Sequence, residues 1–365
     1  MNNKGMNSAA VKASNRAAVL KTLNRYGKMS RKDLAARLGL TAATVTIICY
    51  ELHEAGVITT IGEASEKERR AGRKKILIDI DYTHKNVLCV GIEAEKTYIA
   101  LTDLSGKAFA KETINAEAKL DSDAFLKKIA TACKKILRDN PSDKQLLGVG
   151  ITIPGKVEGT RIKDFFEKEL EKDVVVENNV RAFAEGELIY GNARELDNML
   201  LVKWGPGVGS AIISNGRVYR GTKDASAEIG HTLAYKNGRK CRCGKTGCLE
   251  TGISTHAIRD SVEEFKTLPV EKWKSVGEDK LLRLMHDKID ALAVAVCNAS
   301  AMLDPGIVVI HGYMFDLPNV ADEFIKLFNK YSGHDEGFVV KSVLADRQNL
   351  IGPLAIAMNG LFLKS

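Results

Sequence analysis

The chain has 365 residues and a formal net charge of +8, a length that allows two or three domains with a sizeable core. It has no apolar stretch long enough to cross a membrane and no signal-peptide segment at its N-terminus, so we expect a cytoplasmic protein without membrane contact. Four of the seven cysteines stand singly among apolar or helical neighbours, which favours reduced thiols over disulfides. These are Cys49, Cys89, Cys133 and Cys297.

The positive charge is concentrated near the N-terminus. Residues 1–80 carry 15 Lys and Arg against 7 Asp and Glu, whereas the remaining residues carry 39 of each. A neutral body with a basic head is typical of a nucleic-acid-binding domain attached to a second module. The alternative is a solvated basic face with no partner. The helix-turn-helix pattern of residues 1–80, described next, makes this alternative weaker than nucleic-acid binding.

The basic head has the pattern of a helix-turn-helix. Periodicity and capping predict helices at 15–26, 31–38 and 42–55, separated by glycine turns. Ser30 and Thr41 are the expected N-caps of the second and third helices. The third helix begins with small hydroxyl and methyl side chains, which suit the major groove, thymine methyls and phosphates. The DNA contacts expected from these helices are Arg31, Thr41, Ala42, Ala43, Thr44 and Thr46.

Two alternating segments after the third helix predict a wing. Strands at 57–61 and 73–80 flank a charged tip at 63–72. The basic residues expected to reach phosphates or the minor groove are Arg69, Arg70, Arg73, Lys74 and Lys75. A winged helix can also dock proteins, but the excess of positive charge favours DNA.

The rest of the chain predicts a two-lobed α/β body. Strands are expected at 87–103 (two, joined by a turn), 108–114, 147–154, 174–179, 199–204, 210–214 and 307–310. Helices are expected at 122–139, 180–190, 285–302, 318–331 and 350–363. Strands followed by helices, twice over, indicate two lobes with ligands at strand ends. The predicted domains are 1–82, a winged helix-turn-helix; 83–196, a first lobe completed by the C-terminal helix 350–365; and 197–349, a second lobe.

Two local features of the body carry further expectations. Asn215-Gly216 predicts a type I′ hairpin turn. The mostly apolar helix at 285–302 is a candidate for dimer or lobe packing, and a plain core helix is the alternative.

A cysteine-rich segment in the second lobe predicts a zinc site. Cys241, Cys243 and Cys248 fall within eight residues punctuated by glycines, a spacing that suits tetrahedral thiolate coordination. A fourth ligand is needed, and His231 is the nearest upstream candidate. Glu228 and Glu250 bracket the segment, which favours a polar pocket for a hydroxyl-rich ligand. The alternative is a zinc loop that only stabilises the fold.

The segment Glu-Ile-Gly-His followed by Cys-x-Cys-Gly-x-x-Gly-Cys-Leu-Glu resembles the signature of the ROK family of sugar-responsive repressors and sugar kinases. The winged head resembles its repressor branch, which includes xylose and N-acetylglucosamine repressors. The resemblance implies an actin-like, ribonuclease-H-like sugar-kinase fold behind the winged helix-turn-helix. It implies structural zinc on His231, Cys241, Cys243 and Cys248. It also implies a sugar site formed by Asn178, Asn179, Glu228, His231 and Glu250.

Three departures from the family pattern argue against phosphoryl transfer. Asn179 stands where the kinases have an Asp base, and an amide cannot accept the proton of the sugar hydroxyl. The expected phosphate loop at 91–97 lacks its glycines and carries Glu93 and Glu95, which would repel phosphate. A Gly-Gly pair expected near adenosine is replaced by His311-Gly312. We therefore expect no enzyme activity, no catalytic residue and no bound ATP.

Two other departures concern the ligand and the wing. The segment at 156–176 is shorter than usual and highly charged, which is consistent with a more open pocket, another ligand or an empty site. Lys74 replaces a common proline of the wing. The favoured interpretation is a DNA-binding repressor of carbohydrate metabolism that senses a sugar or sugar derivative. We expect it to form a dimer or a tetramer. The alternatives are a sugar kinase with a DNA-binding head and a regulator that no longer binds sugar.

Overall fold

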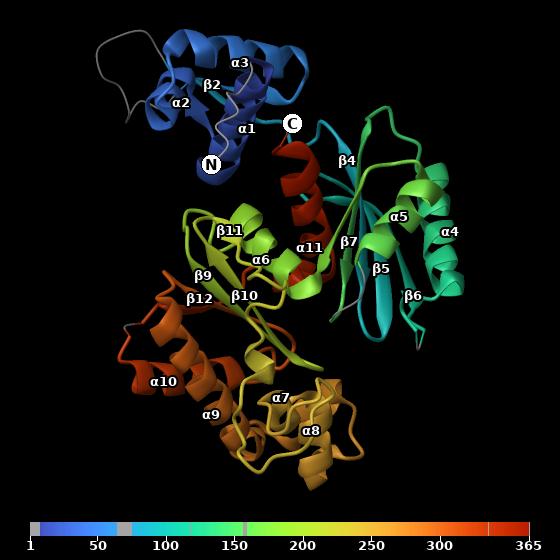
Figure 1. Cartoon of the computed structure of the whole chain (residues 1–365), viewed down its shortest axis with the longest axis vertical. Helices are drawn as coiled ribbons and strands as arrows, with labels where there is room; N and C mark the ends of the chain where they lie inside the picture. The colour runs from blue at the N-terminus through green and yellow to red at the C-terminus, as the bar shows by residue number, and fades with distance from the viewer. Residues whose placement is uncertain (1–7, 64–74, 118, 156–158, 335, 365) are drawn as a thin grey trace. The chain divides into compact units, whose positions relative to one another are not determined.

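The computed structural model describes residues 8–63, 75–117, 119–155, 159–334 and 336–364 (Figure 1). The chain divides into two compact units. The first unit contains Met1–Ile189 and Arg347–Ser365, and the second contains Tyr190–Asp346. The contact-defined units therefore change at 190 and 347, and the predicted domain limits at 196 and 350 stay predictions. No helix among the described residues is long and apolar enough to cross a bilayer.

The head of the first unit is a three-helix domain with a small sheet. Its elements are α1 (Ser8–Tyr26), β1 (Met29–Ser30), α2 (Arg31–Leu38), α3 (Ala42–Glu54), β2 (Ile58–Glu63) and β3 (Ile76–Ile80). The strands are antiparallel in the order β1-β3-β2. Both predicted caps are confirmed, because the hydroxyls of Ser30 and Thr41 accept the backbone N–H groups of Asp33 and Thr44. The helix expected at 15–26 begins earlier, at Ser8, and the pairing of β1 was not predicted.

The body of the first unit is a five-stranded sheet in the order β6-β5-β4-β7-β8. The strands are β4 (Asn86–Ile92), β5 (Lys96–Asp103), β6 (Ala108–Asn115), β7 (Leu146–Ile153) and β8 (Val174–Asn178). The first three pair antiparallel, whereas β4, β7 and β8 run parallel. The carboxyl ends of three neighbouring strands therefore meet at one edge, and α6 (Asn179–Tyr190) starts there.

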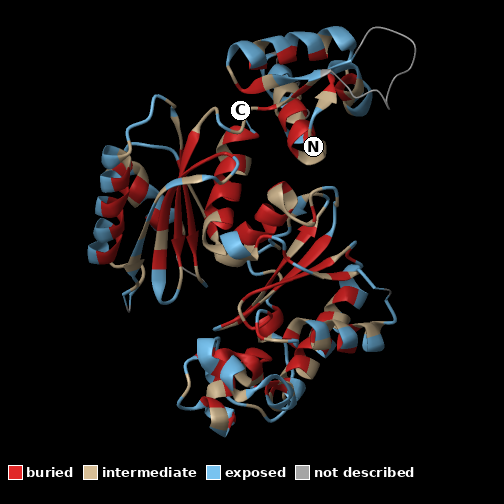
Figure 2. Cartoon of the chain, turned by 180° about the vertical axis from the view of Figure 1, so that it is seen from behind, coloured by how far each residue is buried: buried red, intermediate tan, exposed pale blue. Residues whose placement is uncertain are grey.

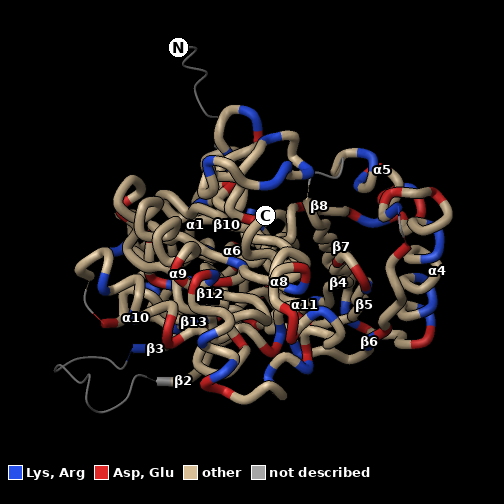
Figure 3. Tube along the Cα trace, turned by 90° about the horizontal axis from the view of Figure 1, so that it is seen from below, with Lys and Arg blue, Asp and Glu red and all other residues tan. Residues whose placement is uncertain are grey.

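Helices cover both faces of this sheet (Figure 1). On one face lie α4 (Asp123–Asp139) and α5 (Gly159–Leu170), whose apolar residues share a core with the strands. Figure 3 shows residues of both charges along α4. Lys134 of this helix pairs with Glu169 of α5 at 2.7 Å. The charged segment at 156–176 thus contains a helix that covers the sheet.

The opposite face packs against α11 (Gln348–Ala357), which is buried along most of its length (Figure 2). A short π-helical turn, Met358–Phe362, continues it. Gly150 makes the close approach possible, because a Cβ there would lie 1.9 Å from the carbonyl oxygen of Pro353. The C-terminal helix therefore completes the body of the first unit.

The second unit is built on the mixed sheet β11-β10-β9-β12-β13. Its strands are β9 (Met199–Trp204), β10 (Val208–Ser214), β11 (Arg217–Val218), β12 (Val308–His311) and β13 (Val339–Lys341), the last of which was not predicted. Its main helices are α7 (Glu250–Ile253), α8 (Thr255–Ser261), α9 (Glu278–Leu303) and α10 (Val320–Ser332). The turn at Asn215-Gly216 has positive φ at both residues (52° and 68°), as a type I′ turn requires.

One apolar core holds the second unit together. Trp204 and Phe315 meet edge to face with ring centroids 5.5 Å apart, and α9 contributes a buried stripe that includes Met285 and Ile289. This stripe fits the core-helix interpretation of the apolar segment at 285–302. Its proposed role in a dimer stays a prediction.

Candidate functional site

The four predicted metal ligands lie together in the second unit. One ligand atom from each of His231, Cys241, Cys243 and Cys248 falls within 4.8 Å of the other three. The Cys243 and Cys248 sulfurs are 3.6 Å apart, and Cys241 Sγ is 3.5 Å from His231 Nδ1. With Zn–S bonds of about 2.3 Å, the edge of a tetrahedral site is about 3.8 Å. Three thiols and one imidazole at these separations fit Zn²⁺.

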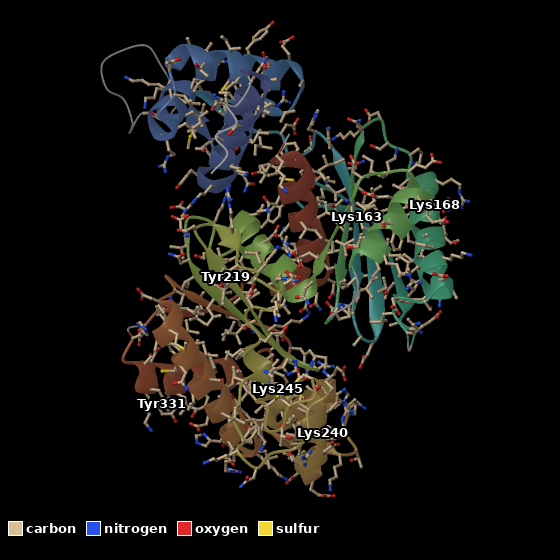
Figure 4. All side chains as sticks on the ribbon, in the orientation of Figure 1. Lys163, Lys168, Tyr219, Lys240, Lys245 and Tyr331 are labelled. Carbon is tan, nitrogen blue, oxygen red and sulfur yellow. The ribbon has the colours of Figure 1, made fainter. Side chains whose placement is uncertain are left out.

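Glycines and short backbone hydrogen bonds shape the loop that carries the cysteines. Cys241 N donates to Lys245 O at 2.8 Å, and Gly244 N donates to Cys241 O at 2.9 Å. Gly247 has φ of +80°, and a Cβ there would lie 1.9 Å from Tyr235 O. The loop also carries Lys240 and Lys245 (Figure 4). A tight turn thus brings ligands separated by two to seven residues onto one centre.

The environments of two cysteines differ. The backbone N–H of Lys245 lowers the pKa of the exposed Cys243 thiol. Burial, followed by the neighbouring thiols, raises the pKa of Cys248 to about 12. A metal ion compensates such a cost by binding the thiolate form.

His231 links the cysteine cluster to the first predicted sugar ligand. Its Nδ1 faces Cys241, while its Nε2 lies 3.8 Å from the carboxylate of Glu228. An acid beside the second nitrogen of a metal-binding histidine orients the ring and fixes its tautomer. Glu228 itself is nearly half exposed on its side chain, at 43 %.

Glu250 is buried and has two partners. One carboxylate oxygen accepts the backbone N–H of Val208 at 3.0 Å, and the other lies 3.1 Å from the guanidinium of Arg242. Gly207 leaves room for the acid, since a Cβ there would lie 2.6 Å from Glu250 Oε2. The sequence reasoning missed Arg242, although its position between two ligands, Cys241 and Cys243, was a usable signal.

Asn178 and Asn179 belong to the first unit, at the carboxyl end of β8. The Asn178 side-chain oxygen accepts the N–H groups of Val180 and Arg181 at 2.9 and 3.3 Å, and its amide donates to Gly155 O at 3.3 Å. The Asn178 side chain therefore caps α6.

The Asn179 amide contacts one of the acids in the expected phosphate loop. Its Nδ2 lies 3.1 and 3.0 Å from the two carboxylate oxygens of Glu93. Glu93 directly follows β4 and Asn179 directly follows β8, so the parallel strands bring both to the same edge. Two of the departures from the kinase pattern are thus in direct contact.

The third departure, His311-Gly312, lies at the end of β12 in the second unit. Burial, followed by the charge of Lys203, lowers the pKa of His311 to about 3, so its ring is neutral at ordinary pH. Gly312 has φ of +111°, and a Cβ there would lie 2.4 Å from Trp204 O. Close packing against β9 explains why position 312 keeps a glycine.

The predicted DNA contacts of the helices lie mostly on the surface of the head. Thr44 is half-buried, whereas the others are exposed: Arg31, Thr41, Ala42, Ala43 and Thr46. Lys75 pairs with Asp33 at 2.9 Å, whereas the other predicted wing contacts lie outside the described residues: Arg69, Arg70, Arg73 and Lys74. The sequence reasoning missed two exposed apolar side chains on α3, Ile47 and Tyr50.

Comparisons with known proteins agree with this arrangement. The sequence model of a winged helix-turn-helix DNA-binding domain matches residues 15–59, and that of the ROK family matches residues 87–359. The xylose repressor of Caldicellulosiruptor bescii is 23% identical over 338 residues, covering 83% of this chain and 84% of that repressor. The DNA-binding transcriptional dual regulator NagC of Escherichia coli K12 is 28% identical over 270 residues, covering 69% of this chain and 65% of NagC.

A solved structure has the same fold over nearly the whole chain. It is a ROK family transcriptional regulator described as a homologue of the E. coli MLC protein, with a TM-score of 0.81, 22% identity and 97% coverage of both chains. This likeness supports the predicted winged head and actin-like sugar-kinase body as the fold class. The ROK family model matches residues 87–359, which is most of this chain, so the chain belongs to the ROK family.

Proposed function

We propose that the chain is a DNA-binding transcriptional repressor of carbohydrate metabolism whose ROK body senses a sugar or sugar derivative and transfers no phosphate. The xylose repressor and the DNA-binding transcriptional dual regulator among its relatives support this proposal. The DNA-binding part is supported by the match of residues 15–59 to a winged helix-turn-helix. The observation that carries the absence of phosphoryl transfer is the contact between Asn179 and Glu93.

That contact is incompatible with the kinase reaction. A kinase needs a carboxylate free to accept the sugar hydroxyl proton and a loop that tolerates the γ-phosphate. Here an amide occupies the base position and donates to a carboxylate in the loop. Purified protein with ATP, Mg²⁺ and a panel of hexoses is expected to form no sugar phosphate. Turnover of any hexose above the background would establish the kinase alternative.

We propose that the effector binds at Glu228, His231 and Glu250 of the second unit, with Asn178 and Asn179 as further candidates. Hydroxyl groups of a sugar suit carboxylate acceptors, and the Val208 N–H orients the buried carboxylate of Glu250. A thermal-shift panel of sugars, amino sugars and sugar phosphates would identify the effector, because a ligand specific to the folded state raises the melting temperature.

Glu250→Gln tests this site. The amide keeps an oxygen for the Val208 N–H but loses the charge, so the fold should persist while the effector response is lost. Glu271→Gln, an exposed change in the same unit, is the matched control and should respond like the parent chain. A Glu250→Gln variant that still releases DNA on addition of effector would exclude Glu250 from the site.

The second candidate function is a regulator that no longer responds to sugar. The ion pair between Arg242 and Glu250 favours it, because a sugar would have to share or displace the guanidinium. Operator binding without any thermal shift across the panel is the result that would select this candidate.

We further propose Zn²⁺ on the three cysteines and His231, and a homodimer that places two heads on operator DNA. Half-sites would then lie about one helical turn, roughly 34–36 Å, apart. The proposed contacts are those named in the head, including Arg73, Lys74 and Lys75 of the wing. Operator DNA as the partner implies a cytoplasmic location. Light scattering of the free and DNA-bound protein would distinguish a dimer from a tetramer.

A further inference from the structure

The solvent-facing side of α3 is largely apolar between Ala43 and Tyr50. Ala43, Thr46, Ile47 and Tyr50 follow one another at helical spacing and are exposed, with Ile47 and Tyr50 at 57 % and 62 %. The opposite side of the helix, which includes Val45 and Leu52, is buried in the head. Large exposed apolar side chains on one helix face mark an interaction surface.

The composition of α3 excludes the usual contacts with purines. None of its thirteen residues is Arg, Lys, Asn or Gln. Guanine is commonly read by Arg or Lys at O6 and N7, and adenine by Asn or Gln at N6 and N7. Glu51 and Glu54 lie in the last turns of α3, and Glu51 already pairs with Lys12 at 2.6 Å. The first two turns are therefore the part of the helix that suits a groove lined by phosphates.

The threonine hydroxyls of these turns are already engaged. Thr46 Oγ1 donates to Ala42 O at 2.7 Å, and the hydroxyls of Thr41 and Thr44 hydrogen-bond to each other at 2.9 Å. With its proton used inside the helix, Thr46 has no donor for guanine and offers its methyl group to a base edge. Tyr50 retains a phenol that can reach a phosphate or a base.

The charge around this face favours DNA over an apolar protein partner. Arg31 and Lys32 are exposed in the first turn of α2, Lys28 is exposed just before β1, and the head as a whole has an excess of positive charge. Residues 15–59 match a DNA-binding winged helix-turn-helix, in which the second helix of the motif enters the major groove. The apolar stripe therefore belongs to a domain whose sequence and charge suit DNA.

We propose that α3 reads thymine methyl groups in the major groove, with Thr46 and Ile47 as specificity-determining residues and A·T pairs at the operator positions they face. This inference rests on the proposed function as a DNA-binding regulator. It adds the base chemistry by which the operator is selected. Thymine alone carries a C5 methyl in the major groove, and apolar side chains recognise it by contact.

The test begins with selection of operators from random duplexes by the full-length protein. Single thymines of the selected site are then replaced by uracil, which removes only the methyl group. Each contacted methyl should contribute about fourfold in affinity, as expected for burying one carbon. Ile47→Ala should remove the sensitivity to uracil at one position, while Val11→Ala, an exposed change on α1, should keep it. Tyr50→Phe removes the phenol oxygen and keeps the ring, so it separates the contribution of the hydroxyl to DNA affinity from that of the aromatic ring.

The outcomes separate this inference from the proposed function. Failure to enrich any duplex would overturn the proposed function and the inference with it. Enrichment of a site that tolerates uracil throughout, but loses affinity when guanine is replaced by 7-deazaguanine at the positions facing α3, would overturn the inference and leave the regulator intact. Unchanged melting of Ile47→Ala would establish that any loss arises at the DNA and not from unfolding.

Discussion

Replacing Asn179 by Asp restores the base expected in the kinases, and we expect it to destabilise the first unit. The new carboxylate would lie about 3 Å from that of Glu93, where the amide now donates at 3.1 and 3.0 Å. Two unit charges at this distance repel by about 5 kcal/mol at an effective dielectric constant of about 20. Both side chains are half-buried, so rotation and screening reduce the net loss to about 2 kcal/mol.

The penalty in Asn179→Asp should depend on pH. Repulsion raises the carboxyl pKa values in the folded state above their ordinary values near 4, so the folded state binds a proton more tightly than the unfolded chain. The variant should match the parent below about pH 4, lose stability as pH rises through the raised pKa, and show the full loss above it.

Calorimetry is the appropriate assay because both tryptophans, Trp204 and Trp273, lie in the second unit. Their fluorescence identifies the transition of the second unit, and the remaining heat reports on the first. Glu93→Gln combined with Asn179→Asp should recover stability, since the amide and the acid exchange roles. Glu95→Gln, an exposed change in the same loop, should not rescue. An Asn179→Asp variant with parental stability at every pH would refute the contact.

Three other changes test the metal site, the cap and the DNA surface. Cys248→Ser should abolish metal binding and lower the melting temperature detected by tryptophan fluorescence, whereas the control Cys297→Ser should retain the metal. Equal metal content in the two variants would disprove the proposed set of ligands. Asn178→Ala should lower the stability of the first unit by about 1 kcal/mol through loss of the α6 cap, and an unchanged calorimetric transition would contradict that role. Arg31→Ala should weaken binding to all DNA sequences and reduce the slope of log affinity against log salt concentration by about one unit. The control Arg138→Ala should leave this slope unchanged. Identical slopes for the two variants would exclude Arg31 from the DNA interface.

Much of the fold could be predicted because its signals are local. Ser30 and Thr41 cap the helices they were expected to cap, and Asn215-Gly216 forms the expected turn. The start of α1 was missed because the prediction followed the apolar positions at 19, 20, 23 and 26, whereas the helix already begins at Ser8. The helix within the charged segment was missed although Ile162, Phe166 and Leu170 have helical spacing, since its exposed charges obscure the buried side.

The candidate site also has a part with local sequence signals and a part without them. Cys241, Cys243 and Cys248 fall within eight residues, so the cysteine cluster could be predicted from their spacing. The contact between Asn179 and Glu93 joins residues 86 positions apart. It follows only from the parallel pairing of β4, β7 and β8, which brings the ends of distant strands together. The pair of Arg242 and Glu250 likewise depends on how the glycine turn at Gly207 approaches α7.

The strand-end edge of the first unit argues for binding over turnover. Catalysis by a general base needs a carboxylate left available for the substrate proton. Here Glu93 accepts from Asn179, and Glu177 accepts from Asn178 N at 2.7 Å and from Arg181 at 2.8 Å. Acids that are satisfied within the protein gain nothing from a reacting hydroxyl, and they hold the edge rigid. A sensor requires only that its ligand bind one conformation better than another. Such differential binding needs no general base, so these contacts oppose turnover without opposing ligand binding.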